Sequence, residues 1–314
     1  MAEAIRPKEI IQTVCGAISA DKFGRALPHE HIMVDFIGAK ETGTHRWNRD
    51  EVSARMLPFL KDLRKQGFQS FVDCTPAYLG RDPHLLKRLS EQSGLHILTT
   101  TGYYKEPYLP EHAFTESADQ LAARWVLESE KGIEGTDVRP GFIKIAVNPG
   151  KLIPIQQKIV RAAARASKKT GLTIACHTGH GVAALETVHI LQEEGVPLSK
   201  YIFVHADSEP DTKSHFEIAR AGGWVEYDAV GWRPIIEHVK LITAFLAEGL
   251  AERLLVSHDA GWYHVGEKNG GDIKPFTPIW DELLPALERE GMKPEMRRQL
   301  FITNPRKAYT IKQA

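Results

Sequence analysis

The sequence predicts an α/β fold, a (β/α)8 TIM barrel that opens with a short N-terminal β-hairpin. Eight short apolar runs each end in small or polar residues, and a segment with helical periodicity follows each run. Runs that are apolar almost throughout indicate parallel strands buried on both faces. Eight such units over roughly 250 residues are typical of this barrel. No GxGxxG or P-loop follows the first run, which disfavours the alternative, an open doubly wound sheet.

The expected elements follow one another without a linker. A hairpin at residues 8–24 is expected to cover the bottom of the barrel. The eight strands are expected at residues 26–35, 70–76, 96–102, 141–148, 172–179, 201–207, 224–230 and 254–260. No low-complexity tract or Gly/Ser stretch divides the chain, so we expect one domain over 1–314, with the barrel and a C-terminal helix at 25–312.

Capping residues mark the helices between these strands. Asp50 precedes the first helix and Gly67 closes it. Asp82 and Pro83 open the second helix, and Ser117 opens the next. The later helices are expected at 153–170, 182–194, 212–221, 234–248 and 278–290.

Composition excludes several classes of protein. The 40 Lys and Arg residues balance 40 Asp and Glu residues, so no excess of positive charge is present to bind nucleic acid. No apolar run reaches the roughly 18 residues of a membrane span, and the first residues lack the apolar stretch of a secretory signal. Three cysteines fit a reducing compartment, so a cytoplasmic location is expected.

Histidines gather at the expected carboxyl ends of the strands, where barrels of this kind build their active sites. Alternation along the first strand places His29 and His31 on one face and Glu30 on the other. Other strands end at His177, His205, His258 and Asp259. A single strand histidine is at least as often a core residue, but five that converge on one barrel mouth favour a metal site. Imidazole and carboxylate suit zinc, iron, cobalt or manganese.

Lys144 lies inside the apolar run 141–148, where burial of a charged ammonium is costly. One interpretation is a lysine that snorkels or forms a salt bridge on the helix side of the strand. The other is a neutral amine that reacts with carbon dioxide, giving a carbamate with two oxygens that bridges two cations.

The stretch GRALPHEHI at 24–32 resembles the N-terminal signature of the phosphotriesterase family in the amidohydrolase superfamily. The similarity continues in order through Lys144, CHT at 176–178, VHAD at 204–207 and SHD at 257–259, and ends near TNP at 303–305. It therefore spans nearly the whole chain, and one lysine, four histidines and one aspartate fall at matching strands.

The resemblance implies a centre that binds two divalent metal ions. His29, His31 and Asp259 would hold the more buried ion. His177 and His205 would hold the second, and carboxylated Lys144 would bridge both. Zinc is the first expectation, with cobalt, iron or manganese as alternatives.

Two aspartates receive catalytic roles from the same comparison. Asp259 would accept a proton during hydrolysis. Asp228, at the end of the seventh strand, matches an aspartate that relays protons or orients a histidine ligand; a helix or loop cap is its alternative role. His258 and Cys176 should face away from the metals.

The resemblance leaves three activities open: hydrolysis of lactones, of organophosphate triesters and of carboxylesters. Tyr104 matches a tyrosine of the phosphotriesterase-like lactonase branch, where its phenol would contact the lactone or the attacking water; a plain aromatic wall is its alternative role. The loop 261–280 offers Trp262, Tyr263 and Phe276 as wall residues. Ala229 stands where some relatives carry a cationic or imidazole side chain. A lactonase with promiscuous organophosphate triester hydrolysis is the first expectation, and a dedicated phosphotriesterase or carboxylesterase is the alternative.

Two hypotheses from other classes are set against this one. A non-catalytic barrel would not need Lys144, His177 and Asp259 together. A mononuclear deaminase would fit the histidines but not Lys144, and a count of metal ions per chain separates the two. The expected partner is a small ester, lactone or phosphotriester, and the resemblance alone suggests a homodimer.

Overall fold

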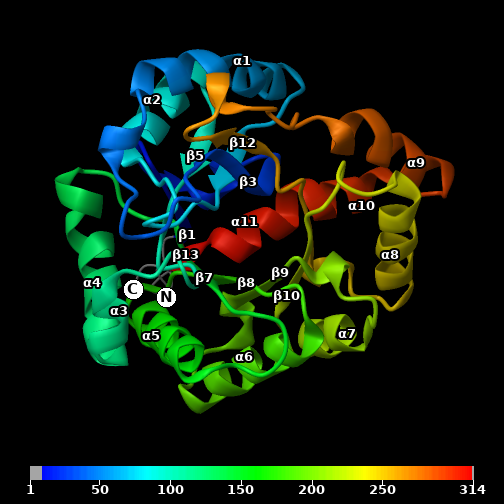
Figure 1. The fold of residues 1–314 in the computed structure, drawn as a ribbon. Helices are drawn as coiled ribbons and strands as arrows, with labels where there is room; N and C mark the ends of the chain where they lie inside the picture. Colours follow the sequence, from blue (N-terminus) through cyan, green and yellow to red (C-terminus); the bar gives the residue numbers. More distant parts are fainter. Residues whose placement is uncertain (1–8, 313–314) are drawn as a thin grey trace, which may run out of the picture.

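The computed structural model describes residues 9–312. Residue 8, the first of the expected hairpin, lies outside this range. The helices form a ring around the strands (Figure 1), and every expected strand is present. The barrel strands are β3 (Ala26–Val34), β4 (Ser70–Asp73), β5 (His96–Leu98) with β6 (Thr100–Thr101), β7 (Phe142–Ala146), β8 (Ile174–His177), β9 (Tyr201–Val204), β10 (Trp224–Tyr227) and β11 (Leu254–Val256).

The strands are parallel, but their ladders form two arcs instead of the continuous ring that the sequence predicts. One arc has the order β11-β10-β9-β8-β7-β6, and the other joins β12 (Gly261–His264) to β3, β4 and β5. The third run divides at Thr99, whose carbonyl accepts a hydrogen bond of 2.8 Å from Gly141. The eighth run divides where Asp259 takes a left-handed φ of 51°, although its amide still donates to the His29 carbonyl at 3.1 Å. The His31 amide also donates to the Ala260 carbonyl at 2.9 Å, so backbone hydrogen bonds bridge the chain at both interruptions of the ladders.

The predicted helices are present with small shifts at their ends, and the short helices α3 and α10 were not predicted. They are α1 (Arg49–Lys65), α2 (Pro83–Ser93), α3 (Glu111–Thr115), α4 (Ala118–Lys131), α5 (Pro154–Thr170), α6 (Gly181–Glu193), α7 (Lys213–Arg220), α8 (Ile235–Ala247), α9 (Leu284–Arg289), α10 (Pro294–Arg298) and α11 (Asn304–Tyr309). Asp82 and Ser117 cap α2 and α4 as expected. The cap of α1 is Asn48, not Asp50, because the Asn48 side chain accepts a hydrogen bond from the Asp50 amide. The last predicted helix begins with a wider turn at Ile279–Leu283 before α9.

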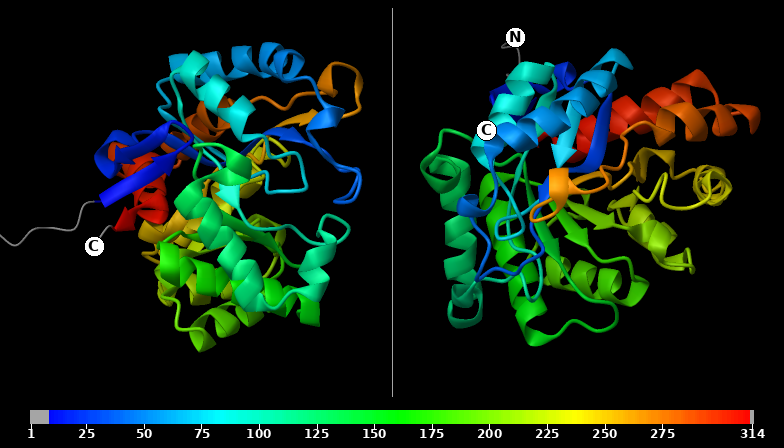
Figure 2. Two further views of the ribbon diagram at one scale, coloured as in Figure 1. Left: turned by 90° about the vertical axis from the view of Figure 1, so that its left-hand side faces the viewer. Right: turned by 45° about the horizontal axis from the view of Figure 1, so that its top comes forward.

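A small antiparallel sheet lies outside the barrel. β1 (Glu9–Thr13) pairs with β2 (Gly16–Ser19), and β13 (Ile311–Lys312) adds a third strand to β1 that the sequence did not predict. Figure 2 shows this sheet at one end of the molecule, with the first and last described strands together. Behind it, α11 packs under the barrel, where Tyr309 donates a hydrogen bond of 2.8 Å to the Pro28 carbonyl. Within residues 9–312, no helix is both long and apolar enough to cross a bilayer.

Candidate metal centre

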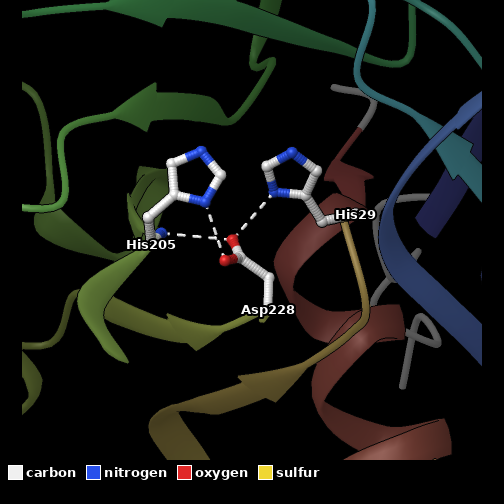
Figure 3. Close-up of side chains that lie close together, drawn as sticks. All are labelled: His29, His205 and Asp228. Carbon is white, nitrogen blue, oxygen red and sulfur yellow. Dashed lines mark hydrogen bonds and ion pairs between the residues drawn. The ribbon is translucent and has the colours of Figure 1, made fainter. Parts of the chain in front are cut away.

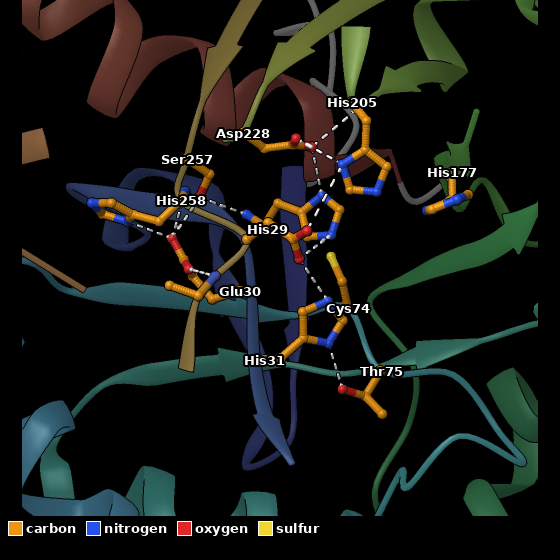
Figure 4. Close-up of polar contacts among 12 residues, drawn as sticks. His29, Glu30, His31, Cys74, Thr75, His177, His205, Asp228, Ser257 and His258 are labelled. Atoms are coloured by element: carbon orange, nitrogen blue, oxygen red, sulfur yellow. Dashed lines mark hydrogen bonds and ion pairs between the residues drawn. The ribbon is translucent and has the colours of Figure 1, made fainter. Parts of the chain in front are cut away.

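β3 places its two histidines on the side that faces the carboxyl-end site. His29 and His31 are 1% and 5% exposed, and their rings lie 5.5 Å apart. Glu30 points the other way, where its carboxylate accepts hydrogen bonds from the Ser257 hydroxyl at 2.8 Å and the His258 ring at 2.7 Å (Figure 4). His258 is fully buried and lies in this supporting contact, not among the metal-facing side chains. Alternation along β3 therefore places the candidate metal ligands on one face of the strand and the hydrogen bonds of Glu30 on the other.

The contact between His31 and Asp259 indicates where a cation belongs. The Thr75 hydroxyl donates to the Met33 carbonyl at 3.0 Å, so its oxygen accepts from His31 Nδ1 at 2.7 Å. The lone pair of His31 Nε2 then faces Asp259 Oδ1, 3.1 Å away. Among the described residues this buried oxygen has no hydrogen-bond partner. Two lone pairs at such a distance repel each other unless a cation or a proton lies between them.

His29 contributes a third lone pair to the same place. Its Nδ1 lies 2.9 Å from Glu226 Oε2 and 3.0 Å from Asp228 Oδ2, so this nitrogen carries the ring proton. Its Nε2 lies 3.6 Å from Asp259 Oδ1. The donor atoms of His29, His31 and Asp259 all lie within 4.8 Å of one another. Burial, with the nearby Lys144 ammonium, lowers the pKa of His29 to about 3, so the ring stays neutral as a metal ligand requires.

Glu226 is a site residue that the sequence analysis missed. It is buried on β10, two residues before Asp228, and so shares the face of that aspartate. Burial and the neighbouring Asp228 carboxylate raise the pKa of Glu226 well above its usual value. Burial also opposes ionisation of Asp228, but the His205 and His29 rings hold the pKa of Asp228 well below its usual value. The two neighbouring carboxyls are thus shifted in opposite directions, with the proton favoured on Glu226 and the charge on Asp228.

Asp228 connects the two halves of the site. Its carboxylate accepts from His205 Nδ1 at 2.7 Å and from the His205 amide at 3.1 Å, while it also contacts His29 (Figure 3). These contacts use the ring nitrogens that carry protons, so Asp228 orients the two histidines and leaves their Nε2 atoms for metal binding. The contact with Asp228 raises the pKa of His205 against the effect of burial.

His177 is the predicted ligand that the structure does not bring into the compact cluster. Its ring lies 4.5 Å from that of His205, centroid to centroid. The Tyr104 hydroxyl lies 2.9 Å from His177 Nδ1, and Lys105 Nζ lies 3.1 Å from His177 Nε2. Burial raises the pKa of Tyr104 and lowers the pKa of Lys105. Tyr104 therefore contacts the second-metal side of the site, and Lys105 is a neighbour that the sequence analysis missed.

Lys144 extends from β7 into the buried base of the site. It is 2% exposed, and its Nζ lies 3.2 Å from His29 Nε2. Among residues 9–312 it has no carboxylate within ion-pairing distance. The side chain therefore points into the site, and the alternative of a lysine that snorkels on the helix side is wrong.

A cavity of about 480 Å³ opens above these side chains. It is lined by His177, Thr178, Gly179, His205, Ser208, Asp228, Ala229, Trp232, Asp259 and Trp262. Of the three predicted wall aromatics, only Trp262 lines it. Tyr263 and Phe276 are buried core residues, and Phe276 packs edge-on against Phe71 at 5.1 Å. Tyr263 was wrongly assigned because β12 continues beside β3 and turns this side chain inward, and Phe276 was wrongly assigned because the loop after β12 packs it into the core.

Trp232 is a wall residue that the sequence analysis missed, and it is 50% exposed. Its indole N–H donates to the His258 carbonyl at 2.8 Å, next to the left-handed backbone of Asp259. A larger cavity of about 730 Å³ lies between residues 42–47 and α4 and includes none of the predicted site residues. We place the site at the smaller cavity, because the convergent polar groups lie there.

The donor set fits a pair of divalent cations. Imidazole nitrogens and carboxylate oxygens are ligands of zinc, iron, cobalt and manganese. The donor atoms of three of them converge at His29, His31 and Asp259, where His29 Nε2 also contacts Lys144 Nζ at 3.2 Å, and each histidine is fixed from behind by a hydrogen bond. His177 and His205 stand beside this group, with their ring centroids 4.5 Å apart.

Comparison with known proteins agrees with this chemistry. The model of the phosphotriesterase family matches residues 9–309. The phosphotriesterase homology protein of Escherichia coli (strain K12) is 30% identical over 278 residues, which cover 87% of this chain and 94% of that protein. The aryldialkylphosphatase of Saccharolobus solfataricus is 27% identical over 305 residues, with 94% and 97% covered.

A similar structure comes from the engineering of organophosphate hydrolysis activity from a weak promiscuous lactonase template. It is 30% identical, with a TM-score of 0.86 and coverage of 96% of this chain and 99% of that one. The structures of this group are TIM barrels, and the family depends on a binuclear metal centre. The protein is accordingly a metal-dependent hydrolase, and the chain belongs to the phosphotriesterase family.

Proposed function

We propose that this protein is a lactonase that holds two divalent metal ions, zinc first, and that hydrolyses organophosphate triesters as a secondary activity. The observation that carries the proposal is the convergence of the donor atoms of His29, His31 and Asp259 at the base of a cavity walled by Trp232 and Trp262. When bound, two such cations acidify a shared water and polarise the oxygen of the bond under attack.

The residues around the cations have distinct roles in this proposal. His29, His31 and Asp259 would hold one ion, and His177 and His205 would hold the other. Lys144, once carboxylated, would supply oxygen ligands to both, and its buried amine 3.2 Å from His29 Nε2 supports this role. Cobalt, iron or manganese would suit the same ligands.

We assign the transfer of the proton released during hydrolysis to Asp259 and Asp228. Asp259 Oδ2 lies 4.0 Å from His205 Nδ1, and that nitrogen contacts Asp228 at 2.7 Å. In this proposal Asp259 would accept a proton during hydrolysis, and Asp228, whose pKa the His205 and His29 rings hold low, would take the proton onward or orient His205.

Tyr104 and the cavity wall support a lactone as the substrate. A phenol that stays protonated beside His177 can donate a hydrogen bond to the ring oxygen of a lactone. The two indoles give the carbon part of the substrate an aromatic surface.

The test is a panel of γ-, δ- and acyl-homoserine lactones, aryl esters and paraoxon on one zinc-loaded preparation. We expect kcat/KM for the best lactone to exceed that for paraoxon. A phosphotriester preferred by more than about 1.4 kcal/mol, roughly tenfold, would favour the alternative of a dedicated phosphotriesterase. Aryl esters that react while lactones do not would favour a carboxylesterase.

A further inference from the structure

Lys105 stands at the site but has no role in the chemistry described above. It follows Tyr104 in the loop between β6 and α3 and is half-buried. Its Nζ lies 3.1 Å from His177 Nε2 and 5.6 Å from the centroid of the Tyr104 ring. The amine is therefore held against a side chain that lines the reaction cavity.

The amine also lacks an acidic partner. In the part of the chain that the structure describes, no carboxylate lies within 4.0 Å of Lys105 Nζ, and its side-chain hydrogen bond is the one to His177. Lys274, another lysine near the cavity, is different: its Nζ lies 5.4 Å from the Trp232 ring and 3.0 Å from Asp272. A half-buried ammonium without an anionic partner is unfavourable unless a ligand supplies one.

Metal binding removes the acceptor that Lys105 now uses. A neutral imidazole has one N–H and one lone pair. If a cation binds His177 through Nε2, the lone pair is occupied; if it binds through Nδ1, Nε2 carries the proton. In both cases His177 Nε2 can no longer accept a hydrogen bond from Lys105.

We infer that Lys105 binds an oxyanion group on the substrate, a carboxylate, sulfonate or phosphate remote from the bond that breaks. This inference rests on the proposed function, because it assumes that His177 binds a metal. The preferred substrate is then an ester or lactone with an anionic group at one end. Its carbon part lies on Trp232 and Trp262, which line the same cavity as His177.

The kinetic experiment compares two esters that differ only in charge, 4-nitrophenyl hydrogen glutarate and its methyl ester, on zinc-loaded protein. The measured quantity is the ratio of kcat/KM for the anionic ester to that for the neutral ester. We expect Lys105→Met to lower this ratio about 10- to 100-fold, mainly through KM, as for the loss of a charged hydrogen bond. Lys105→Arg should restore most of it. Lys274→Met is the matched control and should keep the ratio within about twofold of the wild type.

A binding experiment gives a readout that does not depend on turnover. Hexanesulfonate, which cannot be hydrolysed, is titrated into zinc-loaded protein while tryptophan fluorescence is followed, with hexanol as the neutral comparison. We expect Lys105→Met to weaken binding of the sulfonate relative to hexanol by a similar factor. An unchanged ester ratio, or equal sulfonate binding by the wild type and Lys105→Met, would overturn the inference. If the wild type hydrolyses no ester or lactone, the proposed function fails, while the sulfonate titration still decides the role of Lys105.

Discussion

The two halves of the proposed metal centre differ in how far the protein builds them in advance. His29 and His31 lie on one long buried strand, and each has its second ring nitrogen in a hydrogen bond. His205 is 15% exposed in its side chain, and His177 contacts Tyr104 and Lys105, which lie in a loop. In the first half a cation would displace the contact of Lys144 Nζ with His29 Nε2, and Lys144 is itself a proposed ligand. In the second half a cation would displace the contacts of His177 with Tyr104 and Lys105.

This difference has an energetic consequence. Ligands fixed by packing and hydrogen bonds lose little conformational entropy when a metal binds, so the His29 side should hold its ion more tightly. The His177 side must break contacts to bind, so its affinity should be lower.

Asp259→Asn should abolish hydrolysis and leave at most one metal ion per chain. The substitution keeps the shape of the side chain but removes the charge that faces His29 and His31. Elemental analysis and a lactone assay on the same sample measure both effects. His258→Asn is the control: it lies behind the strand on Glu30 and should retain two ions. If His258→Asn loses metal while Asp259→Asn stays active, our assignment of which of the two side chains points toward the metal site is wrong.

Asp228→Asn should lower kcat/KM or metal affinity about 10- to 100-fold, the usual cost of losing a carboxylate that orients metal ligands. Because Asp228 contacts both His29 and His205, the substitution should lower the affinity for both ions. The affinity of the site that includes His205 should fall more. Competition with a chromophoric chelator resolves the two affinities. An equal loss of affinity for both ions would argue against a difference between the halves.

The strand pattern made one half of the site predictable. Apolar runs predicted the strands, and alternation placed His29 and His31 together with Glu30 behind them. The same alternation puts Glu226 beside Asp228, so that signal was present in the sequence and was overlooked.

Loop residues carried no such signal. Lys105 and Trp232 follow no periodicity, because their positions depend on how the loops fold over the barrel mouth. The left-handed backbone at Asp259 divides the eighth run and opens the seam of the ring, and nothing in the local sequence marks it. β13 has only two residues, too few for a pattern, and it exists because β1 offers an edge to pair with.

Glu30→Gln should lower the free energy of unfolding by about 1–3 kcal/mol, because buried donors lose their acceptor. The Glu30 carboxylate accepts from Ser257, from the His258 ring and from the Ala260 amide at 2.8 Å. A glutamine amide would present a donor to one of these groups. Urea unfolding of the metal-free protein measures the change. An unaltered unfolding midpoint would mean that this contact does not support the first half of the site.

Tyr104→Phe should have the smallest effect, a loss of about 0.5–1.5 kcal/mol in transition-state binding of lactones, the net value of one hydrogen bond. The ring would remain against His177, at a centroid distance of 4.9 Å, so the cavity wall is preserved. The measurement is kcat/KM for a lactone and for paraoxon. An equal loss of kcat/KM for both substrates would mean that Tyr104 acts by holding His177 in place. A loss of kcat/KM confined to the lactone would favour a hydrogen bond from Tyr104 to the ring oxygen of the lactone.

The central claim is that one chain holds two divalent ions in halves of unequal affinity. Its most direct test is a zinc titration of metal-free protein by calorimetry, with anomalous scattering from crystals grown at one and two equivalents. The account predicts that the first equivalent occupies the place between His29, His31 and Asp259. The second should appear beside His177 and His205, with added density on the Lys144 amine. Saturation at one ion per chain, or a first ion on the His177 side, would contradict it.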